Sequence, residues 1–183
     1  EFGPQIVATR FSHDRALVCF NGSEEYSNRA ICTVLTLAGI AIVKGENYVL
    51  SEGHFHSLSA VGLSPTAAMV CFKDFTTRPA HSSCNLVSTS GAAISRVDKI
   101  EVFTGRTSVA RLSESAALAC SSDGHHQFTT VCTTLSLVGA DLVKGTDRAI
   151  QAIGKGEYYA PAGLSATSAV LCFEGESSTG AKQ

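Results

Sequence analysis

The feature that most constrains this chain is an internal repeat of about 50 residues. Its anchor is a short apolar segment that ends in cysteine, and a second cysteine follows 12 or 13 residues after each of the first three anchors. A glycine stands seven residues beyond each second cysteine. The four anchors lie 52, 49 and 52 residues apart, at Cys19, Cys71, Cys120 and Cys172. Three complete copies and the first half of a fourth therefore make up the chain, and this period bounds the fold before any single segment is interpreted.

Local chemistry predicts four short strands in each copy. In the second copy they cover residues 56–62, 67–73, 83–89 and 92–103, the last with a bend near residues 96–98. Leu63-Ser64 begins one turn, Ser90-Gly91 forms another, and Pro79 marks the polar loop between the second and third strands. No segment keeps a 3.6-residue apolar period. The predicted fold class is all-β, with tandem four-stranded antiparallel repeats.

Four-stranded units of this length in tandem are typical of β-propeller blades. The expected boundaries are 5–55, 56–106 and 107–156 for the complete copies, and 157–183 for the half copy with its polar tail. A propeller ring needs about 4–8 blades. We therefore expect a propeller-like partial ring or a fragment of a longer propeller. A ring completed by a second chain and an open array are the alternatives.

The cysteines of the three complete copies predict hairpin disulfides. Each pair joins the end of a second strand to the start of a third, where opposed residues lie close enough to be bridged. Each bridge closes a loop of about a dozen residues, which is worth about 3 kcal/mol in the chain-entropy model. Reduced core cysteines are the alternative, and the spacing does not fit zinc. The predicted pairs are Cys19–Cys32, Cys71–Cys84 and Cys120–Cys132.

Disulfides predict an oxidising compartment, so the expected location is extracellular or at the cell surface, reached through the secretory pathway. Asn21-Gly22-Ser23 is an N-x-S sequon in the expected loop after the second strand, which makes Asn21 a candidate glycosylation site. Cys172 is unpaired in this chain. The repeat places its partner near position 184 or 185, so we expect the chain to continue beyond Gln183.

Charge and hydropathy exclude two classes of partner. Fourteen Lys and Arg against sixteen Asp and Glu give a net charge of −2, and charged residues make up 16% of the chain. Because there is no basic excess to neutralise phosphates, no nucleic-acid partner is predicted. The longest uninterrupted apolar stretch, residues 37–43, is far shorter than the ~18 residues of a membrane span.

Residue types that commonly act in catalysis or metal binding do not form a recognisable site in this sequence. His54 and His56 point to one side of a strand, but the sequence assigns them no third metal ligand. His125-His126 and Glu24-Glu25 lie in predicted hairpin loops, where solvated side chains are the simpler interpretation. No nucleophile elbow, P-loop or zinc-protease motif is present. We therefore predict no catalytic, cofactor-binding or metal-binding residue and no cofactor.

The repeat resembles tandem repeats in large extracellular proteins of marine algae and related protists. The shared elements are the Leu-Ser turn, the Ala-x-x-Cys-Phe strand, the second cysteine, the Leu-x-x-x-Gly segment and the terminal glycine. The resemblance covers the chain except the tail, and it implies propeller-like blades in a cell-surface or matrix setting with no catalytic residues. This chain departs from the pattern at Ser121, which replaces the phenylalanine, and at Arg96-Val97, which replaces Lys-Gly.

Three functional hypotheses follow. The leading one is a non-catalytic extracellular structural or assembly protein of disulfide-pinned repeats, part of a surface filament or larger complex, with other proteins or copies of itself as partners. A carbohydrate-binding, lectin-like propeller is the second, although the chain has no Trp and only 7% aromatic residues. The third is a propeller enzyme domain whose site lies in missing repeats.

Overall fold

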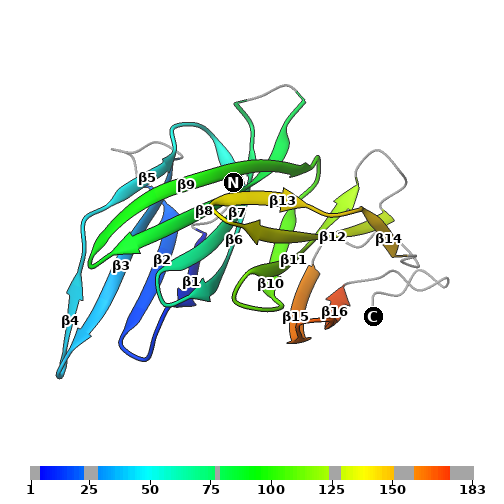
Figure 1. Ribbon diagram of the computed structural model, residues 1–183. Helices are drawn as coiled ribbons and strands as arrows, with labels where there is room; N and C mark the ends of the chain where they lie inside the picture. The colour runs from blue at the N-terminus through cyan, green and yellow to red at the C-terminus, as the bar shows by residue number, and fades with distance from the viewer. Residues whose placement is uncertain (1–4, 23–28, 77–78, 124–128, 151–158, 174–183) are drawn as a thin grey trace.

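The computed structural model describes residues 5–22, 29–76, 79–123, 129–150 and 159–173 of the chain (Figure 1). All the secondary-structure elements assigned in these residues are strands, so the all-β prediction is confirmed. The strands form four antiparallel sheets that follow one another along the chain, here called sheets 1 to 4.

Sheets 1 and 3 have the same design, with a fourth strand that is broken in two. The order is β1-β2-β3-β4 with β5 also on β3, and β10-β11-β12-β13 with β14 also on β12. The strands of sheet 1 are β1 (Ile6–Arg10), β2 (Arg15–Asn21), β3 (Ala30–Ala38), β4 (Ala41–Lys44) and β5 (Tyr48–Ser51). Those of sheet 3 are β10 (Thr107–Arg111), β11 (Ala116–Asp123), β12 (Thr129–Val138), β13 (Asp141–Lys144) and β14 (Arg148–Ile150).

Sheet 2 has a continuous fourth strand, and the described part of sheet 4 is a single hairpin. Sheet 2 has the order β6-β7-β8-β9, and the β9 ladder shifts register opposite Leu86 and Val87. This bulge lies where the sequence predicts a bend. Sheet 2 contains β6 (Phe55–Ser64), β7 (Ala67–Asp74), β8 (His81–Ser90) and β9 (Ala93–Phe103), and sheet 4 contains β15 (Tyr159–Ser165) and β16 (Ser168–Phe173).

The repeated glycines form the turn between the third and fourth strands. Gly39, Gly91 and Gly139 each have φ between 60° and 66°, and each begins a two-residue hairpin turn. The residue after each glycine keeps a negative φ, because Ser57 alone among the described non-glycine residues has a positive one. These turns are therefore type II′, which requires glycine at its first central position and matches the twist of the strands.

The core lies between the sheets. Alternate residues of β7 point to opposite faces of sheet 2, so Val70 packs with sheet 1 and Met69 packs with sheet 3. Sheet 2 is therefore buried on both faces at β7, which explains why this strand is apolar along most of its length rather than alternating. Neither neighbouring sheet buries its apolar residues alone.

The first strands of the sheets bring neighbours closest together. β6 lies beside β1 and β10, and β10 lies beside β15. A Cβ on Gly62 would lie 2.0 Å from the carbonyl oxygen of Arg10, and one on Gly163 would lie 1.7 Å from that of Arg111. Only glycine permits these two backbone contacts. Each contact joins a sheet whose first strand contributes an arginine carbonyl to a sheet whose first strand contributes a glycine.

The sheets therefore alternate between two types. Arg10 and Arg111 occupy one position in the first strands of sheets 1 and 3, and Gly62 and Gly163 occupy it in sheets 2 and 4. Equivalent residues of like type lie 101 positions apart, about twice the cysteine period. The structural unit is a pair of sheets, and this alternation was not predicted.

Candidate functional site

Three disulfides pin the central hairpins. They join the same pairs that the cysteine spacing predicts, and in each pair the two residues stand directly opposite in the ladder between second and third strands. The Cα–Cα distances are 4.1, 4.0 and 4.1 Å for Cys19–Cys32, Cys71–Cys84 and Cys120–Cys132. All six residues are buried, so the disulfides belong to the core rather than to the surface.

Cys172 and Asn21 are the two predicted site residues that lie outside the disulfides. Cys172 is exposed and carries a free thiol on β16. Asn21 is the last residue of β2 and pairs with Ala30, so the expectation that it lies in the loop is wrong. The β2–β3 ladder continues for two more residue pairs beyond Cys19–Cys32, and Asn21–Ala30 is the second of them. Ser23 of the sequon lies outside the described residues.

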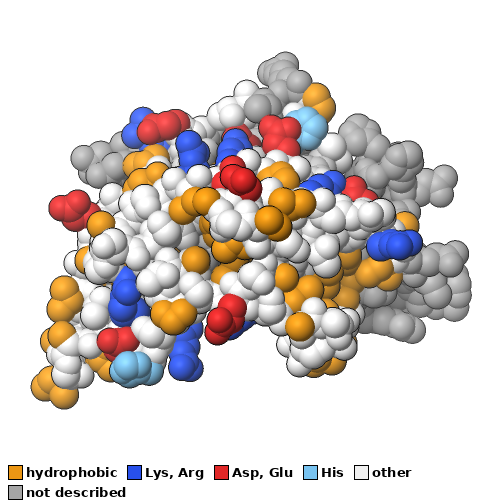
Figure 2. All heavy atoms as spheres, in the orientation of Figure 1, with side chains coloured by type: hydrophobic (Ala, Val, Ile, Leu, Met, Phe, Trp, Pro, Cys, Tyr) orange, Lys and Arg blue, Asp and Glu red, His pale blue; other side chains and the backbone are white. Residues whose placement is uncertain are grey.

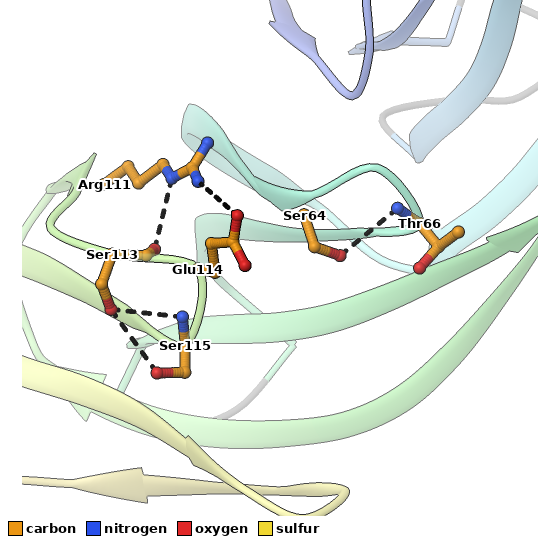
Figure 3. Close-up of polar contacts among 6 residues, drawn as sticks. All are labelled: Ser64, Thr66, Arg111, Ser113, Glu114 and Ser115. Carbon is orange, nitrogen blue, oxygen red and sulfur yellow. Dashed lines mark hydrogen bonds and ion pairs between the residues drawn. The ribbon is translucent and has the colours of Figure 1, made fainter.

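The serine hydroxyls of the Leu-Ser turns form hydrogen bonds within those turns. The Ser64 hydroxyl accepts a hydrogen bond from Thr66 N at 3.3 Å, and the Ser113 hydroxyl accepts one from Ser115 N at 3.2 Å (Figure 3). Arg111 donates to the Ser113 carbonyl at 3.3 Å and lies 3.7 Å from the Glu114 carboxylate. These hydroxyl contacts add to the backbone hydrogen bonds of the turns, such as that from Ser113 N to the Ala116 carbonyl at 3.0 Å, and stabilise the turns.

A cationic and aromatic cluster lies where β6 begins and β7 ends. The rings of His54 and His56 are 5.5 Å apart, as their alternation on one side of the strand predicts. The His56 ring meets the half-exposed Phe75 ring edge-on at 5.0 Å, and Lys73 Nζ lies 5.2 Å from the Phe75 ring centre. A bulge follows His56, with Ser57 at a φ of 60°. Bulges of this kind often re-aim a side chain beside a binding site.

Positive charges act on one another within this cluster. Burial lowers the pKa of His56, and His54, Arg106 and Lys73 lower it further. Burial and Arg106 also lower the pKa of Lys73. An anion bound here would be attracted by the cationic side chains of Lys73 and Arg106, and its charge would relieve their mutual repulsion.

The described residues hold no cluster of three or more His, Cys, Asp and Glu with the arrangement a metal ion requires. Both His125-His126 and Glu24-Glu25 lie outside those residues. The part of the chain that the structure describes also contains no helix with the length and apolar character of a membrane span.

The outer side of sheet 1 is an exposed apolar surface, here called the leading face and defined by Leu35, Leu37 and Ile42. It borders an open hollow of about 300 Å³ whose polar side includes Arg10 and Asp14. Ile42 is 71% exposed, whereas Leu142 in the same position of sheet 3 is 6% exposed because sheet 2 covers it. Figure 2 shows the hydrophobic side chains gathered toward the tip of the β3–β4 hairpin, at the lower left.

The β15–β16 hairpin has a second such surface, here called the trailing face and defined by Leu164, Val170 and Cys172. Leu164 is 71% exposed, whereas Leu63 in the same position of sheet 2 is fully buried. Val170 and Cys172 are also exposed, and their counterparts in sheet 2, Met69 and Cys71, belong to the core shared with sheet 3.

Comparison with known proteins gives no relative. The chain matches no protein-family model, no curated protein and no solved structure.

Proposed function

We propose that the chain is a non-catalytic extracellular structural protein, whose disulfide-pinned β-repeats form a propeller-like or open array within a larger assembly. The observation that carries this proposal is the way the sheets share their cores, since sheet 2 has no free apolar face and each neighbour depends on it. Repeats that bury their faces only against neighbours are typical of proteins that function as extended scaffolds.

The setting rests on the disulfides. Three buried bridges within the described hairpins are compatible with a secreted protein, because such bonds persist in oxidising compartments. The resemblance to repeats of algal and protist extracellular proteins leads to the same expectation. The prediction that the protein has no enzymatic activity belongs to this proposal as well.

The proposed role is tested by locating the protein in its source cells. An antibody raised against the chain should label the surface or matrix of unpermeabilised cells, with gold particles along a continuous structure in electron micrographs. Labelling confined to the cytosol would contradict the proposal. Turnover of a glycan or an ester by the purified protein at a constant rate per mole would contradict its non-catalytic part.

Carbohydrate binding is a second candidate, and the cluster around Phe75 favours it. An exposed ring can stack on a sugar while the Lys73 ammonium attracts its sulfate or carboxylate groups, with the His54 and His56 rings beside it. Binding to an array of sulfated glycans should disappear in Phe75→Ala and Lys73→Ala but persist in Val97→Ala, a matched exposed position on β9. Equal binding by all three variants would exclude this site.

A further inference from the structure

We propose that the cationic and aromatic cluster where β6 begins binds the sulfate groups of a polysaccharide, and that His56 takes up a proton from solvent as it does so. The site then holds its ligand in mildly acidic surroundings and releases it as the pH rises. The inference rests on the second candidate function, because it gives carbohydrate binding a ligand class and a regulator. The cluster comprises His54, His56, Lys73, Phe75 and Arg106.

The ladders of sheet 2 bring the cluster onto one face of that sheet. A row of directly paired residues crosses all four strands, in the order His56, Lys73, Ser82 and Phe103. Paired residues share a face. Cys71, two residues before Lys73 on β7, packs in the core shared with sheet 3, so the row lies on the face turned to sheet 3.

Arg106 joins the cluster from the segment that leads out of sheet 2 into sheet 3. The Ser82 hydroxyl donates a hydrogen bond to the carbonyl of Gly105, the residue before Arg106, and so ties this segment to the row. Arg106 is close enough to His56 and Lys73 to lower the pKa of both. Basic groups from two strands and from the connection between sheets therefore meet at one place.

The extension of β6 that carries His56 has no counterpart in the described residues of sheet 3. β6 begins four residues before Ser59, whereas β10 begins one residue before Ser108, which has the same position in the repeat. The added length contains the bulge after His56, with Ser57 at a φ of 60°. Backbone strain of this kind is concentrated at binding sites. The bulge and the strained residue set the direction of the His56 ring.

The half-exposed Phe75 ring supplies a contact for the sugar itself. It meets the His56 ring edge-on at 5.0 Å, and Lys73 Nζ lies 5.2 Å from its centre. A sugar ring stacked on Phe75 would carry its sulfate groups close to both of these side chains. Free sulfate lacks the apolar contact, so a sulfated sugar is the better ligand.

The groups around His56 make its charge depend on a ligand. His54, Arg106 and Lys73 act on it electrostatically, and all three are basic. Burial and these neighbours hold the pKa of His56 below the ordinary value of 6.5 for a histidine, so the ring is uncharged at pH 7 in the free protein. Asp74 follows Lys73 on β7, and its side chain is therefore turned to the opposite face of the sheet.

A bound sulfate group reverses this balance. A sulfate ester stays negatively charged at any physiological pH, and beside His56 it favours the protonated ring, whose two N–H groups are both donors. The pKa of His56 is therefore higher in the complex than in the free protein. Affinity is greatest below the free pKa and falls as the pH rises through the bound pKa. A difference of about one pKa unit corresponds to about a tenfold change in affinity.

The test measures binding of dextran sulfate to the full chain by calorimetry at about pH 5.5 and about pH 7.5, on either side of the histidine range and at constant salt. Unmodified dextran is the uncharged control ligand. The affinity should be about tenfold greater at the lower pH. Buffers of different ionisation enthalpy should show that binding takes up protons. His56→Gln should keep the weaker binding seen at the higher pH and lose most of the rise.

His13→Gln is the matched control variant. His13 belongs to sheet 1 and its side chain is 87% exposed, so removing it changes the charge of the chain at low pH without touching the cluster. This variant should keep the tenfold rise. Lys73→Ala should weaken binding at both pH values, because it removes a basic group whose charge does not depend on His56.

Two results would overturn the inference and leave carbohydrate binding in place. The unmodified chain could bind dextran sulfate equally well at both pH values, or His56→Gln could keep the full rise in affinity. If the unmodified chain binds no dextran sulfate at either pH, the carbohydrate-binding candidate fails together with this inference. None of these results bears on the structural role, which surface labelling tests separately.

Discussion

At the scale of single residues, one position in the third strand separates the two sheet types. Thr33 and Thr133 each donate a hydrogen bond to the carbonyl of the glycine that follows β4 or β13, Gly45 O and Gly145 O, at 2.9 and 3.0 Å. Asn85 occupies the same position in sheet 2, where Val97 replaces the glycine. The Asn85 side chain is fully buried and neither its oxygen nor its nitrogen is hydrogen-bonded.

Replacing Asn85 should therefore stabilise the protein. Asn85→Val removes two unpaired polar atoms and suits a strand, so the free energy of unfolding should rise by about 1 kcal/mol. Thr33→Val is the matched control and should lower it by about 1 kcal/mol, because it breaks a buried hydrogen bond. Urea titration of both variants measures the difference. Equal destabilisation by both would show that Asn85 has a partner.

At the scale of strands and hairpins, the disulfides and the turns fix the register of successive ladders. The Cys71–Cys84 pair fixes the register from within the β7–β8 ladder, and the type II′ turn at Gly91 fixes that of the β8–β9 ladder from its end. A slip by one residue would turn every side chain to the opposite face. The repeat therefore keeps both features in each complete copy.

Removing one disulfide should cost about as much as its loop closure. Cys71→Ala with Cys84→Ala should lower the free energy of unfolding by about 3 kcal/mol, since the bridge closes a loop of about a dozen residues. Cys172→Ala is the control and should change it by less than about 0.5 kcal/mol, because that thiol is exposed. Guanidinium denaturation measures both. An unchanged midpoint in the double variant would contradict the structural role of the bridge.

Sheets 2 and 3 are also joined by an ionised carboxylate. Asp98 accepts hydrogen bonds from Leu142 N on β13 and from Lys99 N, both at 2.7 Å. These bonds lower the pKa of Asp98 below the ordinary value of 3.8 for an aspartate carboxyl. Because the unfolded chain then binds a proton more readily than the folded one, this contribution to stability is present above pH 3.8 and is lost as the pH falls through the folded pKa.

The expected result is a difference in acid sensitivity. Asp98→Asn cannot ionise, so its stability should fall less steeply than that of the unmodified protein between about pH 5 and pH 2. Urea midpoints measured across this range at constant salt give the comparison. Parallel curves for the two proteins would show that the carboxylate does not join the sheets in solution.

At the scale of the whole molecule, the sheets stay together through backbone contacts as well as through their shared cores. Gly62 N donates to the Thr9 hydroxyl at 2.7 Å, and its missing Cβ lets β6 lie against the Arg10 carbonyl. The strands at this contact come from sequence copies some 50 residues apart. The contact holds sheets 1 and 2 in one relative position.

A single methyl group should disturb that position. Gly62→Ala should lower the free energy of unfolding by about 3 kcal/mol, because the added Cβ would overlap backbone that cannot move aside as a side chain can. Gly91→Ala is the control, with open space around its Cβ and a cost of about 1 kcal/mol from its positive φ. Thermal unfolding gives the ranking. The reverse order would show that the sheets are not packed as described.

The sequence allows local features to be predicted better than long-range ones. Cysteine pairs, glycine turns and the bend in β9 follow from spacing and residue type within one copy. The split of the fourth strand into β4 and β5 beside Gly45 was missed, since the sequence alone does not show that Lys-Gly breaks a strand that Arg96-Val97 only bends. The leading and trailing faces also could not be predicted, because exposure depends on which sheet lies next to which.

The alternation of sheet types could have been found in the sequence. Arg10 and Arg111 share one position of the repeat, and Gly62 and Gly163 share it in the other two copies. A search at about twice the cysteine period would show this. Its meaning still needs the structure, because only the distance to a neighbouring carbonyl explains why the residue must be glycine.

The proposal that this is an extracellular protein whose repeats are pinned by disulfides is tested most directly by non-reducing peptide mass spectrometry of protein isolated from its native source. The account predicts three linked pairs, Cys19 with Cys32, Cys71 with Cys84 and Cys120 with Cys132. Finding these six cysteines as free thiols in the native protein would contradict it.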